Sequence, residues 1–221
     1  MIWEPASGDV AEIPLTRDFE SVNSVSWHPH GTAVTFSDFG ADATFDPDTG
    51  EQIGTRLSLR GQGQAGVAIW KPDGEHVLGA GTLGISEWEF ATGERRSPVD
   101  RNVPTERMDL APEADVLITL DTAGQVWFWD LVSGSSIGEP MPNQRLGSLK
   151  YFTTLVGIDG AGSYASLDGG DGTVIWNLDP EVWREAACAA AGRNMTRDEW
   201  ARTMGGQPYG ATCEQWSEAS A

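Results

Sequence analysis

Residues 126–138 read VWFWDLVSGSSIG, a run that places two tryptophans, an aspartate and a Ser-Gly turn close together. Aromatic and aliphatic residues that end in such a turn are typical of a β-strand followed by a hairpin. One copy of this run leaves open whether its Trp-Asp pair is catalytic, stacks on a ligand or packs in a core. The rest of the chain decides between these alternatives.

An aromatic residue followed by an acidic or amide residue recurs along the whole chain. The aromatic positions are Trp3, Phe45, Trp88, Trp129 and Trp176, and Asp130 completes the best-preserved pair. Their spacings of 42, 43, 41 and 47 residues are too even for chance. We therefore expect these residues to define a structural repeat and to pack between its units.

Two further breaks divide each repeat. Turns lie sixteen or seventeen residues before the last four aromatic positions, at Pro29, Pro72, Pro112 and Gly160. Glycine breaks lie between these turns and the aromatic positions, at Gly40, Gly84, Gly124 and Gly172. Proline and glycine favour turns at such places. Each period therefore holds four short strands, which is typical of a β-propeller blade.

The segments LDTAGQVWFWDLVSG and GGDGTVIWNL resemble WD40 repeats, and the resemblance covers residues 1–179. It implies an all-β propeller portion of about four four-stranded blades. It also implies a non-catalytic scaffold or sensor for protein–protein interaction in bacterial signalling or regulation. WD40 blades often bury a histidine in a network with a hydroxyl residue, an aspartate and the tryptophan. None of the three histidines occupies that position, and only Asp121 and Asp171 match the aspartate, so we expect an incomplete network.

The ends of the repeat leave two arrangements open. The chain begins on the end of a third strand, and its last blade stops before Pro180 without an outer strand. Residues 8–15 could supply that strand and close a ring of four blades. Alternatively, the chain is a fragment of a larger ring, or an arc whose bare strand edges associate with another chain.

The composition changes after Asp179, which predicts a second domain over residues 180–221. Pro180 begins one predicted helix that ends at Gly192, and a capping box formed by Thr196 and Glu199 begins another. The segment resembles the C-terminal tail of many bacterial WD40 proteins. The matching residues are Cys188, Gly192–Asn194, Thr196, Glu199, Trp200, Tyr209 and Cys213.

Cys188 and Cys213 are the only cysteines of the chain, and the resemblance of the tail places them near each other. A disulfide and a packed pair of thiols are both open, and a reducing cytosol favours the thiols.

Charge and hydropathy narrow the class of partner. The chain has 14 basic and 33 acidic residues, a net charge of −19, which repels phosphate backbones and argues against nucleic acid. No apolar run is long enough to span a membrane, and the first residues lack the pattern of a secretion signal. We expect a cytoplasmic protein whose partners are other proteins, or further copies of itself.

The candidates for chemistry are weak. GQGQAG at residues 61–66 fits a dinucleotide fingerprint but lies between two predicted strands, where a loop is expected. His28 and His30 lack a third metal ligand at suitable spacing. We therefore expect no catalytic residue, cofactor or metal ion. The alternative is a ligand-sensing or enzymatic propeller that uses the central channel.

The repeat also indicates which tryptophans pack in the core. Trp27 and Trp70 recur on the first strand of successive blades, which favours packing. Trp127 and Trp216 have no counterpart in the repeat, and we expect Trp127 to point to the opposite sheet face from Trp129.

Overall fold

The chain forms two compact units in the computed structural model, Met1–Ile175 and Trp176–Ala221. The structure describes residues 2–3, 6–12, 22–37, 42–57, 67–142, 155–169, 172–204 and 206–217. The predicted boundary after residue 179 lies within a few residues of the division between the units.

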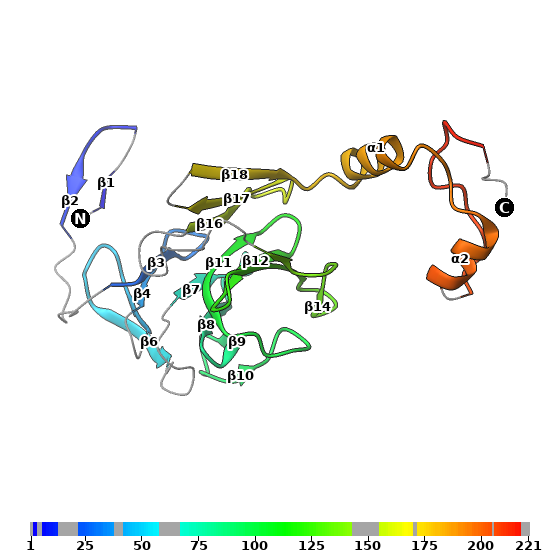
Figure 1. Ribbon diagram of the computed structural model, residues 1–221. Helices are drawn as coiled ribbons and strands as arrows, with labels where there is room; N and C mark the ends of the chain where they lie inside the picture. The colour runs from blue at the N-terminus through cyan, green and yellow to red at the C-terminus, as the bar shows by residue number, and fades with distance from the viewer. Residues whose placement is uncertain are drawn as a thin grey trace. The chain divides into compact units, whose positions relative to one another are not determined.

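Four antiparallel sheets follow one another along the first unit (Figure 1). The first sheet contains β3 (Ser24–Trp27), β4 (Val34–Ser37), β5 (Asp42–Phe45) and β6 (Gln52–Leu57). The second contains β7 (Val67–Trp70), β8 (His76–Gly81), β9 (Gly84–Glu89) and β10 (Arg95–Arg96). The third contains β11 (Thr105–Ala111), β12 (Val116–Asp121), β13 (Gln125–Asp130) and β14 (Ser135–Ser136), and β15 (Met141–Pro142) also pairs with β13. The fourth contains β16 (Leu155–Ile158), β17 (Tyr164–Gly169) and β18 (Gly172–Asn177).

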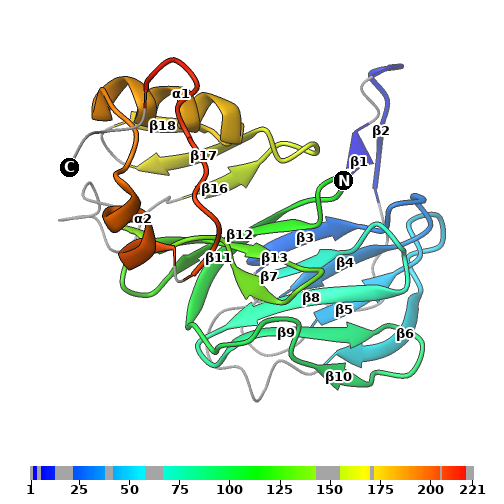
Figure 2. The same ribbon diagram turned by 90° about the vertical axis from the view of Figure 1, so that its right-hand side faces the viewer.

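The first strands of successive sheets lie against one another, β3 on β7, β7 on β11 and β11 on β16 (Figure 2). Among the described residues the fourth sheet has no comparable contact with the first. The fold is therefore all-β and propeller-like but not closed, which confirms the predicted fold class.

Ring closure by residues 8–15 is not the arrangement found. β2 (Val10–Ala11) pairs with β1 (Ile2–Trp3) in a separate two-stranded sheet, whereas residues 13–15 lie outside the described part of the chain. Gly8, at φ +78°, sits in the turn between these strands. A short loop joins its two ends at less entropic cost than a pairing with a distant strand, so the local hairpin forms.

The second and third sheets present their repeat aromatics, Trp88 and Trp129, toward the preceding sheet. Phe45, Trp88 and Trp129 are buried, and Trp88 packs with Trp70 in one apolar cluster. Trp129 packs against Leu78 of the second sheet in a larger cluster. We refer to this side of each sheet as its aromatic face and to the other as its opposite face.

The acidic residue that follows the aromatic stabilises the next turn. Asp130 accepts hydrogen bonds from the Val132 amide at 2.9 Å and from Ser133 Oγ at 2.8 Å. The bond from Ser133 and then that from Val132 lower the pKa of Asp130. The Trp-Asp pair therefore combines a core residue with a turn residue.

The second unit contains α1 (Pro180–Ala191) and α2 (Arg197–Thr203). Asp179 caps α1 through the Glu181 amide, and Thr196 forms the capping box of α2 with Glu199. Caps of this kind satisfy amide groups that the first helical turn leaves without partners. No described helix is long and apolar enough to cross a membrane.

Candidate functional site

His28 connects the first and second sheets. Its Nε2 lies 3.1 Å from the Gly74 carbonyl oxygen, and its Nδ1 accepts a hydrogen bond from the His30 amide at 3.2 Å. Thr32 Oγ1 lies 3.1 Å from the same Nδ1, and the ring packs edge-on against Trp70 with centroids 4.8 Å apart. Both ring nitrogens of His28 therefore make contacts within the fold.

No group of three or more His, Cys, Asp or Glu side chains that could hold a metal ion occurs in the described residues. The GQGQAG segment at residues 61–66 and Asp171 lie outside those residues.

A charged cluster occupies the second sheet around the buried Glu87 carboxylate. Arg96 Nη2 lies 2.6 Å from Glu87 Oε1. Lys71 Nζ lies 3.6 Å from the same oxygen, and His76 Nε2 lies 3.9 Å from it. His76 Nδ1 in turn lies 2.8 Å from Asp73 Oδ2. Glu87 raises the pKa of Arg96 by hydrogen bonding and by its charge. Partial burial opposes a lower pKa for Asp73, but hydrogen bonds from Glu75 and His76 outweigh it.

The charged side chains of this cluster contact one another. The Glu87 carboxylate is buried and contacts Arg96 and Lys71 of its own sheet, which suits a structural ion pair. Sequence reasoning missed the cluster because it depends on the register that places Arg96 opposite Glu87.

Trp127 lies on the same face as Trp129, and the prediction of opposite faces is wrong. Residues two positions apart in a strand point to the same side. The two indole rings stack with centroids 5.4 Å apart and an interplanar angle of 12°. Trp127 Nε1 donates to Asp121 Oδ2 at 2.9 Å, and Trp129 Nε1 donates to Thr119 Oγ1 at 3.0 Å. In the third sheet a second tryptophan thus bonds the aspartate that the resemblance would pair with histidine.

The described residues leave the β3 part of the first sheet's aromatic face exposed, although Val34 and Phe45 on the same face are buried. Trp27 and Trp70 hold equivalent places, because Trp27 pairs with Val34 and Trp70 with Val77 in the same register. The side chain of Trp70 lies against the first sheet, and the residue is 5 % exposed, whereas Trp27 is 44 % exposed. Val25, two residues earlier on the same face, is exposed as well. We call Val25 and Trp27 the leading face.

At the end of the arc, it is the opposite face of the last sheet that is exposed. The residue before each repeat aromatic lies on the opposite face of its sheet, and Phe128 at this position is only 9 % exposed. Ile175, before Trp176, is 67 % exposed, and Tyr164 of the neighbouring strand is exposed too. We call Tyr164 and Ile175 the trailing face. These two faces are the candidate functional site.

The sequence signal for this site was the equivalence of Trp27 and Trp70 in the repeat. Trp27 matches Trp70, and both were expected to pack. The missing information was which sheet has no described neighbour, and that is a property of the three-dimensional arrangement.

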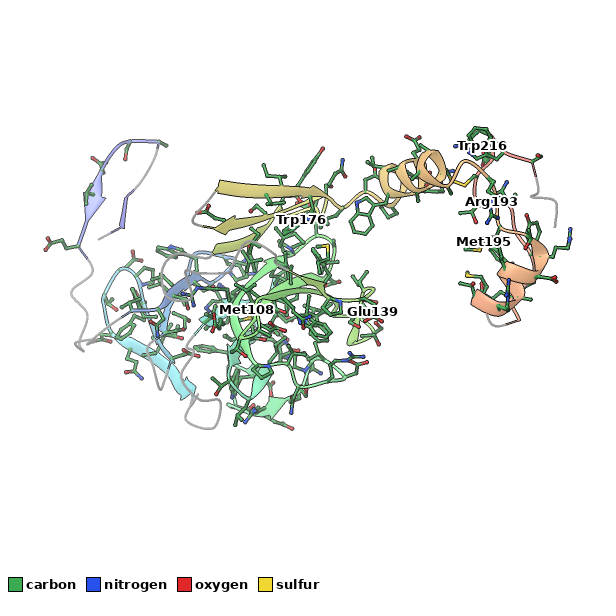
Figure 3. The ribbon with its side chains drawn as sticks, viewed as in Figure 1. Met108, Glu139, Trp176, Arg193, Met195 and Trp216 are labelled. Carbon is green, nitrogen blue, oxygen red and sulfur yellow. A yellow bond between two sulfur atoms is a disulfide. The ribbon has the colours of Figure 1, made fainter. Side chains whose placement is uncertain are left out.

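The motif residues of the second unit hold its own fold together (Figure 3). Cys188 and Cys213 form a disulfide. The buried Asn194 side chain accepts from the Cys213 amide at 2.9 Å and donates to the Cys213 and Trp216 carbonyl oxygens at 3.0 and 2.6 Å. Arg193 makes two hydrogen bonds to the Glu199 carboxylate. Trp216 itself is half exposed, and its Nε1 donates to the Cys188 carbonyl oxygen at 3.3 Å.

No family model and no curated protein matches the sequence. Solved structures do match the fold. The crystal structure of the computationally designed Ika4 protein is similar with a TM-score of 0.56 and 12% identity, covering 77% of this chain and 99% of that chain. A chain in the crystal structure of a mitotic checkpoint complex is similar with a TM-score of 0.58 and 14% identity, covering 74% of this chain. This chain spans about half of that one, 51%. At such identities the likeness shows the fold alone.

Proposed function

We propose that this chain is a non-catalytic, WD40-like interaction module that binds other proteins through the open ends of its arc. It serves as a scaffold or sensor in bacterial signalling or regulation, in the cytoplasm. The observation that carries the proposal is the exposure of Trp27. The matching residue of the second sheet, Trp70, is covered by the first sheet and is buried.

The chemistry of the two faces supports protein as the partner. Tryptophan and tyrosine are enriched in the residues that dominate binding energy at protein interfaces, because they bury much apolar area and keep a polar group for hydrogen bonding. Leading-face residues Val25 and Trp27 are uncharged, as are trailing-face residues Tyr164 and Ile175. The net charge of −19 disfavours nucleic acid as the partner.

The charged cluster also supports a role without catalysis. A channel enzyme would need charged side chains that converge on an accessible point. Glu87 is instead buried and bonded by Arg96 and Lys71 within its own sheet.

Site-specific photocrosslinking in producing cells tests the proposal. A photocrosslinking amino acid replaces Trp27 in one variant, Ile175 in a second and Val132 in a third. Val132 is a matched control because it is exposed but lies in the turn after β13, away from both faces. We expect Trp27 and Ile175 to give crosslinked protein and Val132 to give little. Absence of any protein crosslink from both faces would overturn the proposed function.

A further inference from the structure

We infer that the partner of the leading face is the trailing face of a second copy of this chain, so that two copies associate head to tail. This inference rests on the proposed function, because it assumes that the open ends bind protein. It adds the identity of that protein and the pairing of the two faces.

The contact between the first and second sheets shows what covers an aromatic face in this fold. Trp70 Nε1 donates to Thr35 Oγ1 at 2.8 Å. The backbone amides of Ala68 and Trp70 donate to Ser24 Oγ and Ser26 Oγ, each at 3.0 Å. An aromatic face is therefore covered by the opposite face of another sheet, whose hydroxyls accept hydrogen bonds from the indole and from the amides of the first strand.

The fourth sheet carries an uncovered face of the same type. Ser166 and Thr173 supply hydroxyls there, beside the exposed side chains of Tyr164 and Ile175. Thr173 Oγ1 donates to Asp168 Oδ1 at 3.2 Å, so it retains lone pairs that can accept. The trailing face thus offers apolar area for Val25 and hydroxyl acceptors for the Trp27 indole.

The leading and trailing faces of one chain do not cover each other within the described residues, because Trp27 and Ile175 are both exposed. A contact between two different faces propagates head to tail, and it ends in a closed ring only when the rotation between copies allows it. Closure at two copies also removes both open ends at once.

Charge sets the conditions for this association. Each copy carries a net charge of −19, but Val25, Trp27, Tyr164 and Ile175 are uncharged. Salt screens the repulsion between two acidic copies and leaves apolar contacts in place. Association should therefore strengthen as salt is raised.

Sedimentation of the 221-residue chain over a concentration series measures the dimer. The variants are Trp27→Ser, Ile175→Asp and the control Val132→Asp, each checked by circular dichroism for an unchanged thermal midpoint. A closed dimer contains two such contacts, and truncation of an aromatic anchor costs about 2 kcal/mol or more in each, so we expect Trp27→Ser to weaken dimerisation by about 1000-fold. Ile175→Asp should weaken it comparably, and Val132→Asp should not.

Mixing the two interface variants tests the head-to-tail pairing. A mixture of Trp27→Ser and Ile175→Asp chains retains one intact contact per dimer, so it should dimerise more tightly than either variant alone. Sensitivity to Trp27→Ser without sensitivity to Ile175→Asp would overturn the pairing, and an assembly larger than a dimer would overturn closure at two copies. A parent that stays monomeric at about 100 µM and high salt would overturn self-association. The proposed function would survive that last result if the photocrosslinks at Trp27 contained a different protein, and it would fail if they contained none.

Discussion

The indole nitrogen of Trp70 donates to the hydroxyl of Thr35 on the neighbouring sheet at 2.8 Å, and both groups are buried. Thr35 Oγ1 also lies 2.8 Å from Thr44 Oγ1, so a short chain of polar groups crosses an interface that is otherwise apolar on the Trp70 side. The Thr35 hydroxyl accepts the indole bond across this interface, beside the Ser24 and Ser26 hydroxyls that accept from the Ala68 and Trp70 amides.

Replacing Thr35 by Val keeps the shape of the side chain and removes the acceptor. The Trp70 N–H is then buried without a partner, which costs about 1 to 3 kcal/mol of unfolding free energy. Urea unfolding measures the change. Thr92→Val is the control, because its hydroxyl is exposed and should change stability by less than about 0.5 kcal/mol. Equal effects of the two substitutions would contradict the role of Thr35.

The Glu87 cluster predicts a coupling between Arg96 and Glu87. Arg96→Met removes the 2.6 Å contact and leaves the buried carboxylate with Lys71 at 3.6 Å and His76 at 3.9 Å, so it should lower the unfolding free energy by about 1 to 3 kcal/mol. Adding Glu87→Met should restore part of the loss, because no unpaired charge then remains buried. A double-mutant cycle by urea unfolding gives the coupling, with the exposed Arg107→Met as control. Additive effects would show that the pair does not interact.

The repeat predicted the order of the sheets because the aromatic positions and turn signals are local and regular. Among the described residues four sheets of three or more strands form, and each described turn after Phe45, Trp88 and Trp129 contains a glycine with positive φ, namely Gly50, Gly93 and Gly134. The orientation of Trp127 was predicted wrongly, although it follows from strand periodicity. Residues 127 and 129 are two positions apart in one strand and therefore share a face.

The candidate site could not be predicted from residue types alone. Trp27 and Trp70 are the same residue at the same place in the repeat, and only their neighbours differ. The same holds for Phe128 and Ile175, which both precede a repeat tryptophan. The Glu87 cluster also escaped, because strand register brings Arg96 opposite Glu87. These features depend on which segments meet in space.

The carboxylate of Glu199 predicts a pH dependence for α2. Two hydrogen bonds from Arg193, at 2.7 and 2.8 Å, and one from the Thr196 amide at 2.9 Å lower its pKa from 4.5 to about 2. A lowered pKa means that the carboxylate stabilises the fold above pH 4.5 and that this contribution is lost as the pH falls toward 2. Hydrogen exchange of the α2 amides should therefore accelerate over this range.

Glu199→Gln should remove that dependence, because the amide does not titrate. Protection of α2 in this variant should start lower at neutral pH and change little on acidification. Glu185→Gln, an exposed position of α1, is the control and should behave like the parent. A Glu199→Gln variant that loses protection with the same pH profile as the parent would contradict the assignment.

The disulfide between Cys188 and Cys213 predicts a stability difference confined to the second unit. It closes a loop with a sequence separation of 25, for which the loss of loop-closure entropy in the unfolded chain is worth about 3 kcal/mol. The double substitution of Cys188→Ser and Cys213→Ser should lower the hydrogen-exchange protection of α1 and α2 by about 100-fold. Asn194 should preserve some residual protection, because it bonds both the amide and the carbonyl of residue 213. The first unit should be unaffected, and the reduced parent should match the double variant. Retained protection of both helices after reduction would show that the Asn194 contacts alone hold the unit together.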